Sequence, residues 1–368
     1  ASQHRLRFRC SAPTTEYSAP TGWRSPLAEL GGHPGRLDRR AIRRVVDLEL
    51  DSPSRSGGPM ADVHFESSEA TLGATVTNVD LADLSGEEWQ HIEAAFHDRA
   101  VLVFPAQHLS PAEQADFGRR FGDLAIESMV FSNESPEGTM RPVDDPLVAL
   151  LKGNEGWHTD SSFKPLAAKV SILSAVKVPR TGGQTEWADM RAAYNVLDDV
   201  TRRYIASLSA HHSLQHSQSL VGQGAESTAA ALAVLTSSGS TSTRDEVDDP
   251  PLRPLVKVHP VTRRPALFIG RHAFGIPGLE AGESTRLLSG LLDDACRPPR
   301  VLQHRWSPGD VVIWDNRCVL HRARPYDPAQ ARVMHHTRVK GDPATEMVPT
   351  NHDPPADTEH RRTVTPGA

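Results

Sequence analysis

The sequence predicts a mainly β domain with flanking helices, whose core is a double-stranded β-helix, or jelly roll. Short apolar runs and alternating patterns typical of strands recur between residues 72 and 339. Helical patterns gather early in the chain and again around residues 284–296. Many short strands with few, clustered helices favour two packed sheets that are braced by helices.

Period-two alternation or a short continuous apolar run marks each expected strand. Residues 256–270 predict a hairpin that turns near Thr262–Arg264. The strand expected over residues 169–178 places four β-branched residues on one face: Val170, Ile172, Val176 and Val178. The other expected strands cover residues 72–81, 100–105, 310–316 and 331–339.

Start and stop signals define the expected helices. Ser85 and Glu88 form a capping box ahead of a helix over residues 86–98. A second helix begins after Ser110 and is ended by Gly122. A third, amphipathic helix over residues 284–296 turns four leucines inward: Leu287, Leu288, Leu291 and Leu292.

Composition divides the chain into a folded domain and two extensions. Residues 1–59 contain ten arginines and no lysine. We expect them to be a disordered or non-native extension ahead of Met60, although such a segment also resembles a transit peptide, so a targeting role stays open. We expect residues 60–342 to form one domain with a mobile loop or lid at 217–251, and residues 343–368 to be a disordered tail.

Charge, hydropathy and cysteine content exclude several classes of partner. The net charge is −6, so no basic field indicates a nucleic-acid partner. No apolar run approaches the length that a membrane span needs, so we expect no membrane partner. Three scattered cysteines, Cys10, Cys296 and Cys318, are too few for a disulfide framework. We therefore expect a protein of the reducing cytoplasm.

Three polar residues form a candidate metal site. His158 and Asp160, in "GWHTDSSF", are two apart and would point to the same face of an extended strand. His321, in "WDNRCVLHRARPYD", follows a distant apolar strand and is the best third ligand. Two imidazoles and one carboxylate leave three metal positions open, as non-haem Fe(II) oxygenases require.

The three residues alone leave other functions open. The chain has 18 histidines, so a His-x-Asp pair often arises by chance. A His/Asp/His site could also bind zinc and activate water for hydrolysis. A non-catalytic binding protein on the same fold is a further alternative.

Two long segments carry a resemblance. "WHTDSSFKPLAAKVSILSAVKVPRTGGQTEWADMRAAY" and "HRWSPGDVVIWDNRCVLHRARPYD" resemble the taurine dioxygenase and 2,4-dichlorophenoxyacetate dioxygenase family. The likeness covers roughly residues 62–342, with 217–251 poorly matched. It implies a jelly-roll enzyme that uses Fe(II), 2-oxoglutarate and O2, with His158, Asp160 and His321 as the iron ligands.

The resemblance also implies a 2-oxoglutarate site. The family's threonine, 27 positions after the first histidine, corresponds to Thr185, and its arginine, 11 after the last, to Arg332. A tryptophan that lines the same pocket corresponds to Trp306. The residue types suit a dicarboxylate, because a guanidinium forks onto a carboxylate and threonine adds one donor.

The substrate residues depart from the family pattern. Related enzymes often carry an arginine 15 positions after the last histidine, and this chain has His336 there. His336 and Arg338 share a strand face with Arg332, so either could contact a substrate anion. Asn154 matches a position that contacts substrate in some relatives. A histidine is a weaker anion partner, so the charge of the substrate stays open.

The resulting hypothesis is a dioxygenase that hydroxylates, and can thereby cleave, a small anionic organic molecule, with succinate and CO2 as coproducts. Halogenating relatives replace the carboxylate ligand with a small residue, so Asp160 favours oxygenation. Because related enzymes are commonly oligomeric, a homo-oligomer is the assembly that the resemblance suggests.

Overall fold

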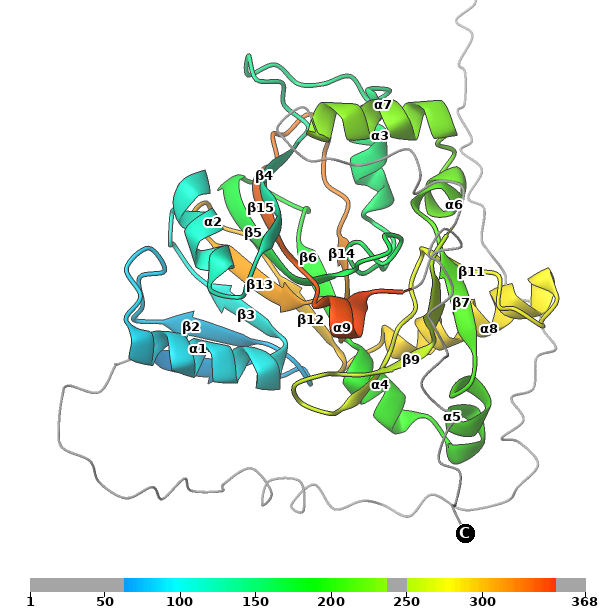
Figure 1. The fold of residues 1–368 in the computed structure, drawn as a ribbon. Helices are drawn as coiled ribbons and strands as arrows, with labels where there is room; N and C mark the ends of the chain where they lie inside the picture. Colours follow the sequence, from blue (N-terminus) through cyan, green and yellow to red (C-terminus); the bar gives the residue numbers. More distant parts are fainter. Residues whose placement is uncertain (1–62, 237–249, 349–368) are drawn as a thin grey trace, which may run out of the picture. The chain divides into compact units, whose positions relative to one another are not determined.

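The computed structural model of the protein describes residues 63–236 and 250–348 (Figure 1). The expectations for residues 1–59, for 237–249 of the predicted loop and for the tail beyond residue 348 lie outside the described residues. Within the described part, no helix is long and apolar enough to cross a membrane.

A seven-stranded sheet forms the centre of the described fold (Figure 1). Its neighbouring strands are antiparallel, except that β2 and β3 run parallel. In spatial order the strands are β1 (His64–Ser67), β2 (Ala74–Thr77), β3 (Val101–Phe104), β13 (Val311–Asp315), β5 (Ala168–Lys177), β15 (Val333–Lys340) and β4 (Leu124–Ser132).

Smaller sheets complete the β structure. One has the order β12 (Val301–His304), β6 (Thr185–Asp189) and β14 (Val319–Ala323). Another has the order β11 (Ala273–Phe274), β7 (Ser209–His212) and β8 (Leu252–Pro254). The predicted hairpin near residue 263 is confirmed as β9 (Val256–Val258) paired with β10 (Pro265–Leu267).

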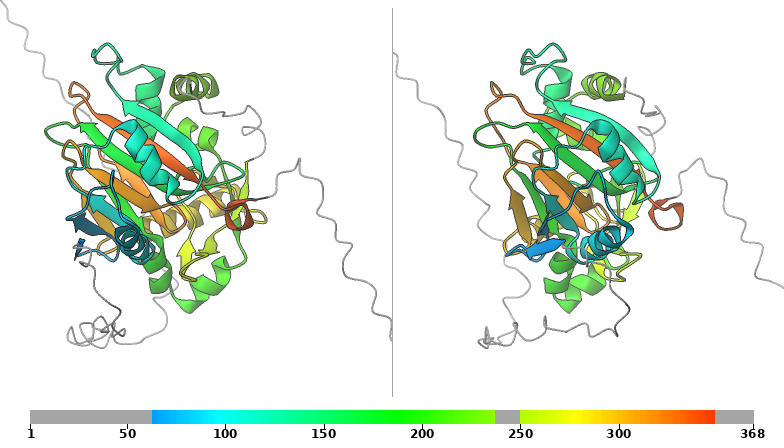
Figure 2. Two further views of the ribbon diagram at one scale, coloured as in Figure 1. Left: turned by 60° about the vertical axis from the view of Figure 1, so that its left-hand side comes forward. Right: turned by 90° about the vertical axis from the view of Figure 1, so that its left-hand side faces the viewer.

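The central strands β3 and β13 of the large sheet are buried on both faces, which explains their continuous apolar runs. On β13, Val312 and Trp314 belong to a core shared with β6 and β14. The alternate residues Val311 and Ile313 belong to a second core. Helices α1 (Gly86–Arg99) and α2 (Pro111–Arg119) cover that second face (Figure 2). The mainly β prediction with flanking helices is therefore confirmed.

The capping signals correctly located the helix starts. The predicted capping box at Ser85 is formed, and the second helix, which was predicted to begin after Ser110, also has a capping box there. Helix α8 (Ala281–Ala295) begins three residues before the predicted start, because Glu280 and Glu283 form an additional capping box. Of its four predicted inward leucines, Leu288 and Leu291 are buried, while the other two pack partly buried against the same core.

The remaining helices are α3 (Pro146–Gly153), α4 (Met190–Val196), α5 (Asp199–Ile205), α6 (Leu214–Ser219), α7 (Ala225–Thr236) and α9 (Pro343–Glu346).

Two segments that were predicted to lack structure contain helices. The loop prediction for 217–251 is therefore wrong up to residue 236. Alanine favours the helix α7, and Ala231 packs against Leu147 and Leu150 of α3. The tail prediction is wrong at α9, where buried Glu346 pairs with Lys257.

The predicted valine face of β5 is only half correct. Val170 and Ile172 are buried, but Val176 is 43% exposed. β13 pairs with β5 only as far as Ser174, so the last part of β5 extends beyond that neighbour. The strand predicted over residues 72–81 is likewise shorter, because Asn78 adopts a left-handed backbone conformation that ends β2.

Gly182, just before β6, provides a test of the backbone. Its φ is +78°, and an added Cβ would collide with the carbonyl oxygen of Pro325. We expect Gly182→Ala to lower the free energy of unfolding by at least about 2 kcal/mol. The control is Gly290→Ala, on the exposed face of α8, where an added Cβ would meet open space. This change should raise the free energy of unfolding by about 0.5–1 kcal/mol. Urea unfolding of both variants measures the difference, and equal effects would contradict the backbone described here.

His212, on β7, predicts acid sensitivity. Both of its ring nitrogens are buried, and neither has a hydrogen-bond partner in the described part of the chain. Burial, helped by Arg253, lowers the pKa of His212 to about 3. Between an unfolded pKa of 6.5 and a folded pKa of about 3, the unfolded chain binds more protons, so stability falls as pH falls.

Replacing His212→Phe should reduce that slope by up to about 1.4 kcal/mol per pH unit. Phenylalanine suits the site because His212 already packs on Phe268. Urea unfolding at a series of pH values below 6.5 measures the slope. The exposed His91, replaced by glutamine, is the control. An unchanged slope in His212→Phe would show that His212 is not the group that titrates.

Candidate active site

Backbone pairing brings the two candidate histidine ligands together. The amide of His158 donates to the carbonyl of His321 at 3.0 Å, and the reverse hydrogen bond is 2.7 Å. Their rings lie on the same side, with centroids 4.1 Å apart. Beside this bridge, the guanidinium of Arg322 lies 4.4 Å from the ring of Trp157 and is held by Glu186. Two distant segments are thereby fixed in one register.

Asp160 completes the predicted group. One ligand atom from each of His158, Asp160 and His321 lies within 4.8 Å of the others, and all three residues are buried. His321 Nε2 is 3.9 Å from Asp160 Oδ2. The structure thus brings the distant His321 together with the neighbouring pair His158 and Asp160.

The protonation states suit a divalent metal. Burial lowers the pKa of His158 to about 3 and that of His321 to about 4, so both imidazoles are neutral. His158 Nδ1 lies 2.8 Å from the carbonyl of Gly156, and a proton on Nδ1 leaves the Nε2 lone pair available. Burial alone would raise the pKa of Asp160, but Arg338 and the neighbouring histidines together lower it, and the carboxyl group is ionised.

Polar residues support Asp160, and the sequence analysis missed two of them, Ser171 and Asn316. Ser171 Oγ donates to Oδ2 at 2.6 Å, and Arg338 Nη2 donates to Oδ1 at 2.7 Å. Asn316 accepts from the Asp160 amide and donates to Ser171 Oγ. The sequence gives no spacing signal for Ser171, because it becomes a neighbour only when β5 pairs with β13.

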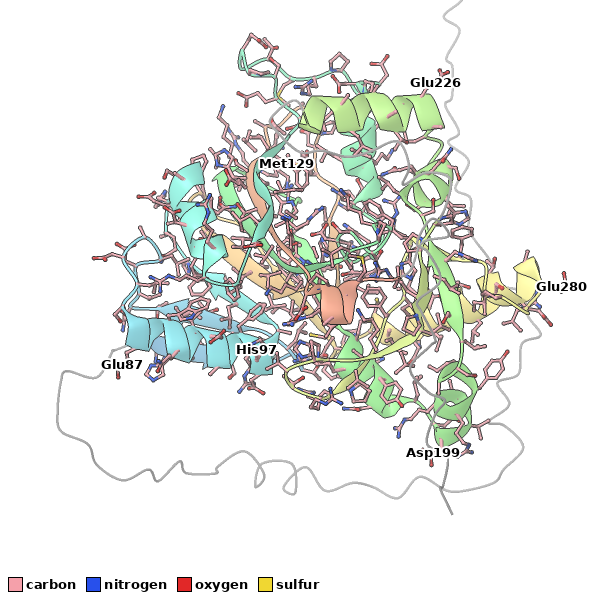
Figure 3. The ribbon with its side chains drawn as sticks, viewed as in Figure 1. Glu87, His97, Met129, Asp199, Glu226 and Glu280 are labelled. Carbon is pink, nitrogen blue, oxygen red and sulfur yellow. The ribbon has the colours of Figure 1, made fainter. Side chains whose placement is uncertain are left out.

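A cavity of about 130 Å³ contains the three candidate ligands. The cavity is also lined by five further candidate residues from the sequence analysis: Asn154, Thr185, Arg332, His336 and Arg338. Met129, labelled on β4 in Figure 3, belongs to an apolar wall. The other large apolar residues of that wall are Phe131, Leu150, Leu151, Phe163, Leu173, Leu214, Leu232 and Trp314.

Of the three residues predicted to form the 2-oxoglutarate site, Thr185 and Arg332 line the cavity and Trp306 does not. Arg332 has one weak backbone acceptor, the carbonyl of Gly183 at 3.3 Å, and burial lowers its pKa. Trp306 does not line the cavity, contrary to the prediction. Its indole nitrogen instead donates to Thr185 Oγ1 at 2.9 Å. That bond occupies an acceptor site of the hydroxyl and leaves the hydroxyl proton of Thr185 free to donate into the cavity.

The two residues predicted to contact a substrate anion, His336 and Arg338, are less able to bind an anion than we expected. Burial and Arg338 lower the pKa of His336 to about 3, so it offers a neutral ring that stacks on Trp314. Arg338 is already bound to Asp160 and to Ser161 Oγ. Asn154 lies at the C-terminal end of α3, where its side chain lines the cavity.

His272 is a cavity residue that the sequence analysis did not identify. It is buried, and its ring centroid is 5.7 Å from that of His158. Ser217 Oγ lies 2.8 Å from its Nδ1. The amide of the adjacent Arg271 donates to the carbonyl of Trp157, which places His272 beside the first ligand. No spacing in the sequence indicates this contact.

A second group could also be considered for a metal: His97, His259 and Asp315. Arg317 binds both carboxylate oxygens of Asp315, and His259 Nε2 lies 2.9 Å from one of them. A guanidinium at this position opposes a second cation. These residues therefore form a salt-bridge network beside β13.

Comparisons with known proteins agree with this geometry. The family described as "Taurine catabolism dioxygenase TauD, TfdA family" matches residues 64–339. The (S)-phenoxypropionate/alpha-ketoglutarate-dioxygenase of Sphingobium herbicidovorans is 50% identical over 281 residues, which cover 76% of this chain and 95% of that protein. The alpha-ketoglutarate-dependent 2,4-dichlorophenoxyacetate dioxygenase of Cupriavidus pinatubonensis is 38% identical and covers 71% and 92%.

A solved structure is similar over the same region. The crystal structure of AAD-2 in complex with Mn(II) and N-oxalylglycine superposes with a TM-score of 0.68 at 35% identity, and covers 76% of this chain and 97% of that one. Sequence, fold and site therefore lead to one assignment. This chain belongs to the TauD/TfdA dioxygenase family.

Proposed function

We propose that this chain hydroxylates a small organic anion at the cavity described above. Its family membership makes it an Fe(II)- and 2-oxoglutarate-dependent dioxygenase, with succinate and CO2 as coproducts. The observation that carries the proposal is the convergence of His158, Asp160 and His321 on one point of a cavity that also contains Arg332.

Each residue of the group has a proposed role. His158, Asp160 and His321 would hold the iron, since two neutral imidazoles and one carboxylate suit Fe(II) and leave positions open. Iron with 2-oxoglutarate supplies the oxidant that inserts one oxygen atom of O2 into a C–H bond. Ser171 and Arg338 hold the Asp160 carboxylate in place, so the ligand geometry is set before the metal arrives.

Arg332 and Thr185 would hold the far carboxylate of 2-oxoglutarate. A guanidinium with only one long backbone hydrogen bond can accept a carboxylate without breaking a strong ion pair. The Thr185 hydroxyl, oriented by Trp306, adds one donor. Both side chains line the cavity, where excluded water would strengthen the ion pair.

The apolar wall favours an aromatic ring as part of the substrate. Phe131, Leu150 and Leu232 offer such a surface, and two named relatives act on aryloxyalkanoic acids. Hydroxylation of a carbon that bears an ether oxygen gives a hemiketal, which collapses to a phenol and a keto acid. We propose aryloxyalkanoate anions as the substrate class.

Finer aspects of the architecture belong to the same proposal. We propose that the large sheet and the β12–β6–β14 sheet are the two halves of a jelly roll, because one core lies between them. Residues 214–236 would act as a lid, since Leu214, Gln218 and Leu232 line the cavity. A cytoplasmic location is consistent with the unpaired Cys296 and Cys318, and a homo-oligomer remains the expected assembly.

A substrate assay tests the proposal directly. Purified protein with Fe(II), 2-oxoglutarate and O2 should release phenol and succinate in equal amounts from (S)-2-phenoxypropionate. The His158→Ala variant is the control. Uncoupled succinate without phenol would overturn the substrate class. Succinate formation no faster than in His158→Ala would overturn the oxygenase function.

The hydrolase and the non-catalytic binding protein are not favoured by the family match. A spectrum separates them from the proposed enzyme. Anaerobic addition of Fe(II) and 2-oxoglutarate should produce a visible charge-transfer band, because the keto acid would chelate the metal. A zinc-dependent hydrolase would show no such band.

Arg332 provides a matched test of the 2-oxoglutarate site. We expect Arg332→Gln to raise the KM for 2-oxoglutarate about tenfold to a hundredfold, because a charged hydrogen-bond pair is lost. Mn(II) affinity should be unchanged, since Arg332 contacts none of the three metal residues. Arg286→Gln, which removes an exposed arginine of α8 that lines neither cavity, is the control. Equal losses of metal and 2-oxoglutarate binding would assign Arg332 a structural role.

A further inference from the structure

A second cavity, of about 200 Å³, adjoins the metal residues. Its polar lining consists of Ser161, Lys164, Arg338 and Lys340, and the other lining residues are alanine, isoleucine and leucine. None of the described residues that line it is acidic. Arg338 lines both cavities, so this second cavity begins where the first one ends.

The fold explains why cations gather here. Arg338 and Lys340 are two apart on β15, so they share one face of the strand. On the neighbouring strand β5, small Ala168 lies opposite Lys340 and leaves room beside it. A turn with left-handed backbone at Ser161 folds back, and the amide of Lys164 donates to the Ser161 carbonyl. This turn brings the third cationic residue to the cavity.

Arg338 does not use all of its hydrogen-bond donors. Nη2 donates to Asp160 and Nη1 donates to Ser161 Oγ, but the buried Nε has no hydrogen-bond partner within residues 63–236 and 250–348. A buried donor without an acceptor costs free energy. Arg338 binds the Asp160 carboxylate and also lines the second cavity, together with Lys164 and Lys340.

We propose that the second cavity binds a small tetrahedral oxyanion, held by Lys164, Arg338 and Lys340. Such an anion presents several acceptors in a small volume, which suits one guanidinium and two ammonium groups. Because Arg338 also binds Asp160, an anion here shares its guanidinium with the metal site. The proposal is independent of the reaction proposed above, because it requires no metal or 2-oxoglutarate.

Calorimetric titration of sulfate into the metal-free full chain tests the proposal, with ionic strength held constant by NaCl. We expect one sulfate per chain, and phosphate should compete for the same site. Lys340→Gln should weaken binding about tenfold, and Lys340→Arg should restore it. Lys340 is exposed, so its replacement leaves the folded core intact, and Lys164→Gln gives an independent second variant.

Two controls decide where the anion binds. Lys152→Gln removes an exposed lysine of α3 that lines neither cavity, and should leave sulfate binding unchanged. Arg332→Gln removes a cation from the first cavity alone, and should also leave it unchanged. The absence of saturable binding would overturn the proposal. Loss of binding in Arg332→Gln but not in Lys340→Gln would place the anion in the first cavity and would also overturn it.

Discussion

The pair of backbone hydrogen bonds between His158 and His321 is the constraint on which the site depends. It joins a loop after α3 to strand β14, and it places both imidazoles on one side of the bridge. Arg322 and Trp157 pack beside the bridge, so its register is held by side chains as well as by the backbone. Asp160 then follows at the spacing that an extended segment provides. The metal site is therefore a consequence of strand pairing.

The side chains around this pair of backbone hydrogen bonds carry both negative and positive charge. The imidazoles are neutral and the carboxylate is ionised, so the three residues together carry one negative charge that a divalent cation would overcompensate. Arg338 balances that charge in the metal-free protein and stands between two cavities. Arg332, just before the first residue of β15, has no ion-pair partner among the described residues and lines the cavity next to the ligands. Residues 332–340 thus carry one cation that supports the metal residues and another that can receive a cosubstrate.

The sequence predicted what depends on local pattern and on motif spacing. Helix start signals located α1 and α2, and the offsets from His158 and His321 pointed to Thr185 and Arg332, which line one cavity. It could not predict contacts that arise only from tertiary pairing, such as Ser171 on Asp160 or His272 beside His158. It also missed α7, because the stability of that helix comes partly from packing on α3. Trp306 illustrates the same limit, since its spacing was right but its contact is with Thr185.

The most direct test of the central claim is anomalous diffraction from crystals grown with Mn(II) and N-oxalylglycine. The account predicts one strong manganese peak, about 2.0–2.3 Å from a nitrogen of His158, an oxygen of Asp160 and a nitrogen of His321. The far carboxylate of N-oxalylglycine should lie on Arg332 and Thr185. A peak at His97, His259 and Asp315, or a manganese ion that lacks any one of the three predicted ligands, would contradict the account.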